Sequence, residues 1–401
     1  MSIIVQKYGG SSVADVNKIG LVADKVVQAK RAGHDVVVVV SAMGKTTDQL
    51  LELAKSVSHA GPSGVIDPPR RELDMLLSTG ERVSMALLSI AIHARGAEAI
   101  SFTGSQSGII TNDRHFDARI IEVRPHRIED ELARGRIVIV AGYQGMSYKR
   151  EITTLGRGGS DTTAVALAAA LGAERCEIYS DVDGVYSADP RVVPDPVHLP
   201  TLDLATLQEM AEAGAKVLNA QAVEWARRSK IAIYARKTAD PVDERGAPAR
   251  ETVAAGDVGD GAARVRAVIG LGNVVVLRAA TPAATLARAA SELDLPLVDL
   301  TGDESGSRAL LPLLNVPDWE KQRSVLGAKV PGLEIAPGQA LVSLVGAELG
   351  GAAPRVLATL AEAGVRASHL VAGPLRVSVT IDASGLEPAQ RALHAAFVSS
   401  S

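Results

Sequence analysis

"HDVVVVVSAMG" occupies residues 34–44, and its run of five valines is typical of a strand that is buried on both faces of a parallel sheet. The preceding stretch, residues 16–33, has apolar residues at helical spacing and ends at Gly33, as a helix does. A short β-rich run at residues 2–8 comes before that helix. The order of strand, helix and strand predicts an α/β layer fold with a largely parallel central sheet.

The same alternation continues along the chain. Residues 135–145, "GRIVIVAGYQG", repeat the strand followed by glycine, residues 162–172 predict a helix, and residues 176–181 predict the next strand. Another helix is predicted over residues 71–92, after a Gly-, Pro- and Ser-rich loop at residues 57–70. Ligands of such sheets bind beyond the carboxyl ends of the strands, so we expect the chemistry in the polar segments that follow the strands.

Length and composition limit the class of protein. A chain of 401 residues suits two or three domains, and 47% hydrophobic with 22% charged residues indicates a globular chain. A net charge of −4 and only 3% aromatic residues exclude the basic field and the stacking platform of a nucleic-acid binder. The start of the chain has no signal-peptide pattern, and no uninterrupted apolar run reaches membrane-spanning length. We expect a cytoplasmic protein with no membrane or nucleic-acid partner.

The C-terminal part contains a weak internal repeat. Residues 274–300 and 341–370 both read as strand, turn, helix and strand, and each is followed by a further strand and helix. The pattern predicts two βαββα modules, over residues 265–335 and 336–401, behind an N-terminal domain at residues 1–245. The Gly- and Ala-rich stretch at residues 240–264 is interpreted as the linker. A purely associative role for the repeat stays open.

Two polar clusters follow the first two predicted strands. In "KYGGSS" (7–12), Lys7 provides a compact cation, while Gly9 and Gly10 allow backbone amides to approach an anion. In "SAMGKTTDQL" (41–50), Ser41 and Thr47 provide hydroxyl groups beside a lysine. Taken alone, the first cluster is equally compatible with a plain turn, and Thr47 or Asp48 also suits the N-cap of the next helix.

A third cluster, "GRGGSDTT" (156–163), precedes the helix predicted at 162–172. Its three glycines leave backbone amides bare, and Arg157 can pair with a carboxylate or phosphate through two hydrogen bonds. Ser160 or Asp161 is placed to cap the helix, whose N-terminus attracts anions. Capping alone does not need three glycines and an arginine, so the pattern favours ligand binding.

The fourth cluster, "YSDVDGVYSADPR" (179–191), follows the strand at 176–181. Its carboxylates, Asp181, Asp183 and Asp189, can hold Mg²⁺ directly or through water, and they are equally suited to Asx turns. Cations, glycine amides and metal-organising carboxylates together indicate a phosphoryl-transfer site that uses ATP and Mg²⁺. The single cysteine, Cys176, excludes an internal disulfide and a Cys-rich metal site.

Several motifs resemble those of the aspartokinases, in the amino acid kinase family. They are "VQKYGGSSV", "VVVVVSAMGKTTDQLLELA", "ELDMLLSTGERVSMALLS", "TTLGRGGSDTTAVALAAALGA" and "EIYSDVDGVYSADPR". The resemblance covers most of residues 1–235, and it extends weakly to the two C-terminal modules, which look like ACT domains. It implies an amino acid kinase-type three-layer sandwich followed by two ferredoxin-like ACT modules.

The resemblance also implies a reaction. ATP would phosphorylate the side-chain carboxylate of L-aspartate to give 4-phospho-L-aspartate, the first step toward lysine, threonine and methionine. Two alternatives remain: another amino acid kinase, acting on glutamate or acetylglutamate, and a non-catalytic amino-acid sensor built on the ACT modules. The family further implies a homo-oligomer.

Residue roles follow from the matching motifs. Lys7 and Lys216 would act as catalytic cations that Asp161 orients, with Ser11 beside the phosphoryl group. Glu81 would bind the substrate's ammonium group, and Arg157 its carboxylate. The nucleotide set would comprise Lys7, Tyr8, Gly9, Gly10, Ser180, Asp181, Tyr186, Asp189, Arg191, Lys216 and Val217, with Asp181 next to Mg²⁺. The amino-acid set would comprise Ser41, Thr47, Glu81, Arg157, Gly158, Gly159 and Ser160.

The ACT-like modules depart from the pattern of amino-acid-binding ACT domains. The first helix is preceded by "ATPAAT" (280–285) and by "LGGAAP" (349–354), in place of a Pro-Gly turn. The stretch "VDLTGDES" (298–305) also lacks the Gln-Asn pair typical of inhibited aspartokinases. An effector, threonine or lysine, therefore stays open, and these departures weigh against feedback inhibition by either.

Overall fold

The computed structural model describes residues 2–59, 67–215, 218–243, 246–256, 264–314, 316 and 318–398. The chain divides into two compact units, and the division does not follow the chain in a single cut. The first unit comprises Met1–Val185, Leu199–Gln208 and Lys216–Asp260, and the second Tyr186–His198, Glu209–Ala215 and Gly261–Ser401. The domain limits 1–245, 265–335 and 336–401 stay a prediction.

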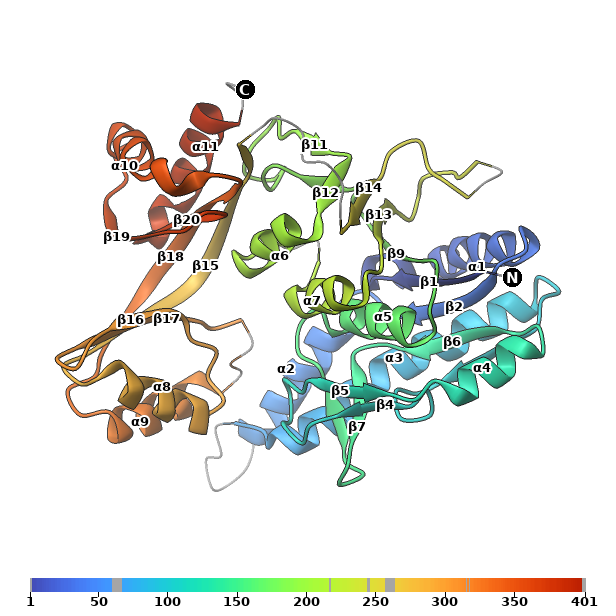
Figure 1. The fold of residues 1–401 in the computed structure, drawn as a ribbon. Helices are drawn as coiled ribbons and strands as arrows, with labels where there is room; N and C mark the ends of the chain where they lie inside the picture. The colour runs from blue at the N-terminus through green and yellow to red at the C-terminus, as the bar shows by residue number, and fades with distance from the viewer. Residues whose placement is uncertain are drawn as a thin grey trace. The chain divides into compact units, whose positions relative to one another are not determined.

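An eight-stranded sheet forms the centre of the first unit (Figure 1). Its strand order is β12-β14-β13-β9-β1-β2-β6-β3, and all neighbours are parallel except β13 and β14. The strands are β1 (Ile3–Tyr8), β2 (Asp35–Val40), β3 (Ala99–Phe102), β6 (Ile137–Ala141), β9 (Arg175–Ser180), β12 (Thr201–Asp203), β13 (Ile233–Lys237) and β14 (Thr252–Ala255). The expected parallel sheet is thus confirmed, and β14 lies inside the stretch that we interpreted as a linker.

Helices cover both faces of this sheet. Helices α1 (Val16–Arg31) and α3 (Arg70–His93) pack on one face, where they share a core with Ile4, Val38 and Ile139. Helices α5 (Gly159–Ala170) and α7 (Ala220–Ser229) pack together on the other face, with α5 against β1 and β9. Because side chains alternate along a strand, Lys7 points toward α5 while its neighbour Tyr8 points toward α1. The three-layer sandwich is confirmed.

Helix α3 is the single described helix that is long and apolar enough to cross a membrane by length and composition alone. Its Leu88 and Ile92 pack in the core beneath the central sheet, and its Leu73 and Leu77 pack around Tyr143. It also buries two carboxylates, Asp74 and Glu81, inside the unit. These contacts make α3 a core helix of the first unit.

A smaller four-stranded sheet, of order β5-β4-β7-β8, flanks the central one. Its strands are β4 (Ile109–Thr111), β5 (Ile120–Val123), β7 (Gln144–Ser147) and β8 (Ile152–Thr154). The loop between β4 and β5 and the loop after β8 both lead toward the site. The remaining elements before the second unit's sheet are the short 3-10 helix Gly10–Val13, α2 (Thr46–His59), α4 (His126–Ala133), α6 (Leu204–Glu212), β10 (Val185–Tyr186) and β11 (His198–Leu199).

The second unit contains one antiparallel sheet, of order β16-β17-β15-β18-β20-β19. Two βαββα repeats build it, which confirms the predicted modules. They are β15 (Val265–Ala279), α8 (Ala283–Glu292), β16 (Val298–Gly302), β17 (Ser307–Pro312) and α9 (Trp319–Lys329), then β18 (Glu334–Gly346), α10 (Ala353–Glu362), β19 (Ala367–Ala372), β20 (Arg376–Asp382) and α11 (Leu386–Phe397). The long strands β15 and β18 pair with each other, so the two modules share one continuous sheet.

The segment 186–198 belongs to the second unit because it is bonded to that unit's elements. The Ser187 carbonyl accepts from Val268 N of β15 at 2.7 Å, and the Ser187 hydroxyl lies 2.8 Å from His394 Nε2 of α11. Arg391 of α11 donates to the Val192 carbonyl at 2.8 Å. The two contacts to α11 run between residues about 200 positions apart, so composition along the chain could not reveal them.

Candidate active site

Lys7 and Asp161 form an ion pair on the α5 side of the central sheet. The distance between Lys7 Nζ and Asp161 Oδ1 is 2.7 Å, and the two side chains are 12% and 9% exposed. Lys7 comes from β1, and Asp161 from the first turn of α5. The pair places an ammonium group beside a helix N-terminus, where the helix dipole and backbone amides favour an anion.

Close backbone approaches bring three loops together at the carboxyl edge of the sheet. A Cβ on Gly10 would lie 2.8 Å from the Ala42 carbonyl, and a Cβ on Gly80 of α3 would lie 2.8 Å from the Ala42 Cβ. A Cβ on Gly142, after β6, would lie 2.7 Å from Ser160 Oγ. Any larger residue at these three positions would separate the loops that carry the predicted site.

The hydroxyl residues expected to line the amino-acid side lie at this edge. Ser41 follows β2, and its amide donates to the Tyr8 carbonyl at 3.1 Å. Thr47 lies in the first turn of α2, which begins at Thr46, so it is not the N-cap of that helix. Thr47 therefore lies at the same end of α2 as Asp48.

Glu81 is a buried carboxylate, 2% exposed, on α3. Its Oε1 accepts a hydrogen bond from the Ala42 amide at 3.0 Å. Burial raises the pKa of Glu81 to about 7, although the backbone hydrogen bonds oppose the rise. Within the described residues Oε2 has no hydrogen-bond partner. A buried oxygen of this kind is suited to accept a cation.

The glycine-rich stretch enters α5 through left-handed backbone. Gly156 and Gly158 have φ of 71° and 76°, and Gly158 is the N-cap of α5 without any side-chain cap. The prediction that Ser160 or Asp161 caps the helix is therefore wrong. Gly158 turns the chain into the helix earlier, which places Asp161 in the first turn, where its carboxylate pairs with Lys7 instead.

Arg157 sits between these two glycines at the surface. Its Nη2 lies 3.5 Å from Asp48 Oδ1 of α2, and both side chains are 59% exposed. Its carbonyl accepts from Asn219 Nδ2 at 2.7 Å, and Asn219 Oδ1 in turn caps α7 by accepting from Gln221 N. An exposed ion pair contributes little stability, so Arg157 can exchange Asp48 for a ligand carboxylate at small cost.

The residues predicted to contact the nucleotide do not all lie together in the structure. Ser180 ends β9, where its hydroxyl accepts from Val182 N at 3.2 Å, and Asp181 is exposed just beyond it. The side chain of Tyr8 is fully buried and stacks on Tyr179 with ring centroids 4.7 Å apart. This burial contradicts any side-chain contact between Tyr8 and ATP and leaves the backbone as its remaining way to contribute.

The five other predicted nucleotide residues are not part of this cluster as described. Tyr186, Asp189 and Arg191 belong to the segment assigned to the second unit. Arg191 pairs with Asp189 through two contacts of 2.9 and 2.7 Å, and its amide donates to Asp189 Oδ1 at 3.0 Å, which makes the Asx turn that the sequence left open. Lys216 and Val217 lie outside the described residues.

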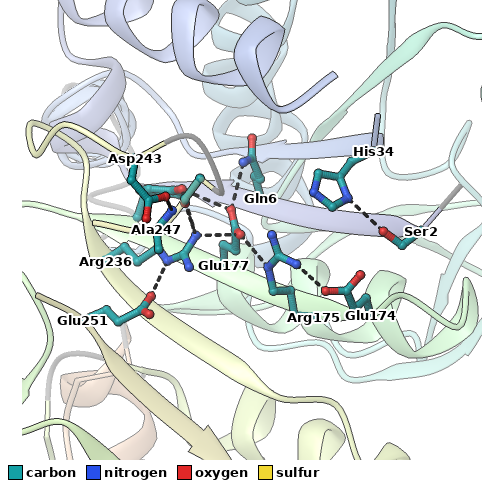
Figure 2. A network of polar contacts seen from close by, with 12 residues as sticks. Ser2, Gln6, His34, Glu174, Arg175, Glu177, Arg236, Asp243, Ala247 and Glu251 are labelled. Carbon is teal, nitrogen blue, oxygen red and sulfur yellow. Dashed lines mark hydrogen bonds and ion pairs between the residues drawn. The ribbon is translucent and has the colours of Figure 1, made fainter. Parts of the chain in front are cut away.

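A buried charge network lies on the α1 side of the sheet, on the face opposite the Lys7 side chain; Figure 2 shows its residues. Glu177 of β9 is its centre: Oε1 lies 2.8 Å from Arg175 Nε and 2.6 Å from Arg236 Nη1 of β13. Gln6 of β1 donates to Oε2 at 2.9 Å, and Arg236 Nε reaches Glu251 at 2.6 Å. Because these side chains join β1, β9 and β13, the network holds the strands that carry Lys7 and Ser180 in register.

Comparisons with known proteins agree with this geometry. Residues 2–236 match the amino acid kinase family. An aspartokinase of Mycolicibacterium smegmatis is 44% identical over 99% of this chain and 96% of its own length. This chain belongs to the aspartokinases, within the amino acid kinase family.

Two solved structures of a relative match over nearly the whole length of this aspartokinase. The E. coli aspartokinase III complex with aspartate and ADP, an R-state, is 25% identical with a TM-score of 0.84, covering 98% of this chain and 99% of that chain. The complex of the same enzyme with lysine and aspartate, a T-state, gives a TM-score of 0.68 and covers 99% of both chains. The full-length match confirms the fold and the family.

Three further residues at the site of this aspartokinase were missed by sequence reasoning. Asp74 is fully buried on α3, Tyr143 follows β6 with a positive φ of 68°, and Asn219 joins the glycine-rich loop to α7. Asp74 lies in the quoted motif "ELDMLLSTGER", seven residues before Glu81, which is two helical turns and the same face of α3. This spacing was the available signal for Asp74; the other two carry none that a single sequence displays.

Proposed function

We propose that this aspartokinase transfers the γ-phosphoryl group of ATP to the side-chain carboxylate of L-aspartate, with the Lys7–Asp161 pair at the point of transfer. The proximity of a lysine, glycine amides and the N-terminus of α5 to Glu81 and Arg157 carries the proposal. The relatives named aspartokinases support the activity, and the E. coli complex shows that such an enzyme binds aspartate and ADP.

The chain's own residues would act mainly through charge and alignment. The attacking carboxylate is ionised near neutral pH, so no general base is needed. Lys7 would neutralise charge on the transferring phosphoryl group, and Asp161 would hold its ammonium in place at 2.7 Å. Glu81 Oε2 would accept the substrate's ammonium, and Arg157 would take its α-carboxylate in place of Asp48.

We also propose Mg²⁺ as the metal that accompanies ATP, beside Asp181. Magnesium is held in most kinase sites by one or two carboxylates together with substrate phosphates and water, and an exposed carboxylate directly after β9 fits this need. The ion would supply charge neutralisation at the phosphates. Tyr186, Asp189, Arg191, Lys216 and Val217 remain proposed nucleotide contacts.

A substrate panel tests the function. Purified protein is assayed for ADP release with ATP and L-aspartate, L-glutamate or N-acetylglutamate, with and without Mg²⁺. Turnover that depends on aspartate supports the proposal. Turnover with glutamate or acetylglutamate alone would favour the other amino acid kinases, and binding of amino acids without turnover would favour the sensor.

The second unit is proposed as the regulatory part. A pocket of about 510 Å³ opens there between the ends of β15, β16 and β17, and its lining includes Arg278, Thr301 and Arg308. Lysine is bound by the E. coli relative in its T-state complex. Adding lysine and threonine separately to the assay measures whether either one inhibits this chain.

The assembly and location of the enzyme are also proposals. We propose a cytoplasmic homo-oligomer, as the family resemblance implies. Size-exclusion chromatography with light scattering, run with and without lysine or threonine, measures the oligomer directly; a mass of 41.6 kDa under all conditions would mean a monomer.

A further inference from the structure

Asp74 is a fully buried carboxylate that bonds to three donors. His115 Nδ1 lies 2.6 Å from Oδ2, while the Phe116 amide and the Thr154 hydroxyl donate to Oδ1 at 3.0 and 2.5 Å. The donors come from two segments: His115 and Phe116 from the β4–β5 loop, and Thr154 from the end of β8. One side chain of α3 therefore ties the β4–β5 loop and the end of β8 to the helix that carries Glu81.

The apolar surroundings of Asp74 make this arrangement costly. Leu73 and Leu77 flank it on α3, and they pack with Tyr143 in a small core. Burial raises the pKa of Asp74, and its hydrogen bonds with Thr154, His115 and Phe116 act in the opposite direction. An apolar side chain would fill this space at a lower cost in free energy than a buried carboxylate. The carboxylate is therefore best explained by the three donors that it binds.

The two tied segments lie against the loop that carries Arg157. Thr154 is followed by Leu155, Gly156 and Arg157, and the Ala118 amide bonds to the Thr154 carbonyl at 2.8 Å. At Gly156 a Cβ would lie 2.6 Å from the Asp117 carboxylate and 3.6 Å from the Phe116 carbonyl. The turn before Arg157 thus packs directly against the β4–β5 loop.

Backbone strain marks the same place. Phe116 and Tyr143 both have positive φ, 73° and 68°, which costs energy for a residue with a side chain. The Tyr143 carbonyl accepts from the Leu155 amide at 2.9 Å, so the strained backbone at Tyr143 also supports the loop before Arg157. The hydrogen bond from the Phe116 amide to Asp74 secures the first of these strained residues.

The charges of the site also converge near Tyr143. Burial raises the pKa of the Tyr143 phenol, a hydrogen bond with the Thr154 side chain lowers it, the carboxylates of Glu81 and Asp74 raise it, and Arg157 lowers it. The charges of Glu81, Arg157 and Asp74 thus all influence the same phenol group.

We propose that Asp74 is a positioning residue for the amino-acid substrate: it fixes the β4–β5 loop and the end of β8, and through them the place of Arg157 relative to Glu81. The proposal rests on the proposed role of Arg157 in binding the substrate carboxylate. Asp74 itself would touch neither substrate. Displacing a binding group by about 1 Å is enough to lower turnover up to about a hundredfold, so loss of the anchor should be measurable.

The test compares Asp74→Asn with a matched surface change, Asp113→Asn. Asparagine keeps the size of the side chain and an acceptor oxygen, but it removes the charge that holds three donors. Asp113 lies in the same β4–β5 loop, and its carboxylate is exposed and paired with Lys149. We expect Asp74→Asn to lower kcat/KM for aspartate roughly thirtyfold with KM for ATP changed less than about twofold, and Asp113→Asn to change neither.

The same pair of measurements is made in an Arg157→Ala background, because a positioning residue acts through its target. There Asp74→Asn should lower kcat/KM for aspartate by less than about threefold, since the clamp is already absent. An equal loss in both backgrounds, an equal loss for ATP and aspartate, or no loss at all would overturn the proposal.

Two controls keep the test decisive. Near-ultraviolet circular dichroism checks that the variants are folded, and should Asp74→Asn not fold, His115→Asn removes one of the three donors and is subjected to the same comparison. Aspartate-dependent turnover by the unmodified chain is measured first. Its absence would refute the proposed function, whereas its presence with a uniform Asp74 effect would refute only the positioning role.

Discussion

Glu81 should make aspartate binding depend on pH in the neutral range. Its pKa is raised to about 7 by burial, and the group must be ionised to pair with the substrate's ammonium. The protonated fraction of the free enzyme would therefore block binding as the pH falls. For a group of pKa about 7, KM for aspartate should rise about tenfold between pH 8 and pH 6.

The substrate contributes little to this dependence, since neither its carboxylates nor its ammonium titrate between pH 6 and 8. The assay is kcat/KM for aspartate at saturating ATP, measured in small pH steps, with Glu81→Gln as the control. The control should show a high KM and no step near pH 7. A step of the same size in Glu81→Gln, or a flat profile in the unmodified chain, would refute the role of Glu81.

The same carboxylate should destabilise the folded chain when no ligand is bound. Its folded pKa of about 7 exceeds the ordinary 4.5, so the folded state holds the proton more tightly and loses stability as the pH rises through that window. The difference corresponds to about 3 kcal/mol at pH 8, which Glu81→Gln should recover in urea unfolding. Equal stability of the two proteins at pH 8 would contradict the burial cost.

Three other substitutions test separate parts of the structure. Lys7→Ala should lower kcat by at least about a hundredfold with a modest loss of thermal stability, and near-normal turnover would remove Lys7 from the transfer step. Glu177→Gln should cost about 3 to 5 kcal/mol in urea unfolding because Arg175 and Arg236 lose their shared buried carboxylate, and a loss below about 1 kcal/mol would mean that the network is dispensable. Gly158→Ala should cost about 1 to 3 kcal/mol, since φ is 76° and the added Cβ would lie 2.8 Å from the Asn219 Cβ, whereas Gly135→Ala, which also has positive φ but meets no atom within 4 Å, should cost less.

The layer architecture could be predicted because its signals are local. The valine run of β2 and the helical spacing of α1 each lie within one stretch of about 20 residues, and burial on both faces of a parallel strand leaves a direct mark on composition. The β-α-β-β-α repeat was readable for the same reason. The joining of the two repeats into one sheet could not be predicted, because β15 and β18, which pair with each other, belong to different repeats.

The chemistry of the site was only partly predictable. Lys7 and Asp161 stood in recognisable motifs, although the capping role considered for Asp161 was wrong because Gly158 supplies the left-handed turn. Tyr143 gave no such signal, and Asp74 gave only its seven-residue spacing from Glu81; the importance of both comes from donors and charges contributed by the β4–β5 loop and β8. Such contacts depend on tertiary packing, and in a single sequence the residues that make them look like ordinary polar or aromatic residues.

The most direct test of the central claim is to trap the product. An acyl phosphate on the side chain of aspartate reacts with hydroxylamine to give a hydroxamate at that carboxyl carbon, which mass spectrometry can locate. The geometry of Lys7, Glu81 and Arg157 predicts ATP-dependent formation of the side-chain hydroxamate of aspartate, in proportion to the ADP released. Release of ADP without any hydroxamate, or a hydroxamate formed only from glutamate or acetylglutamate, would contradict the claim.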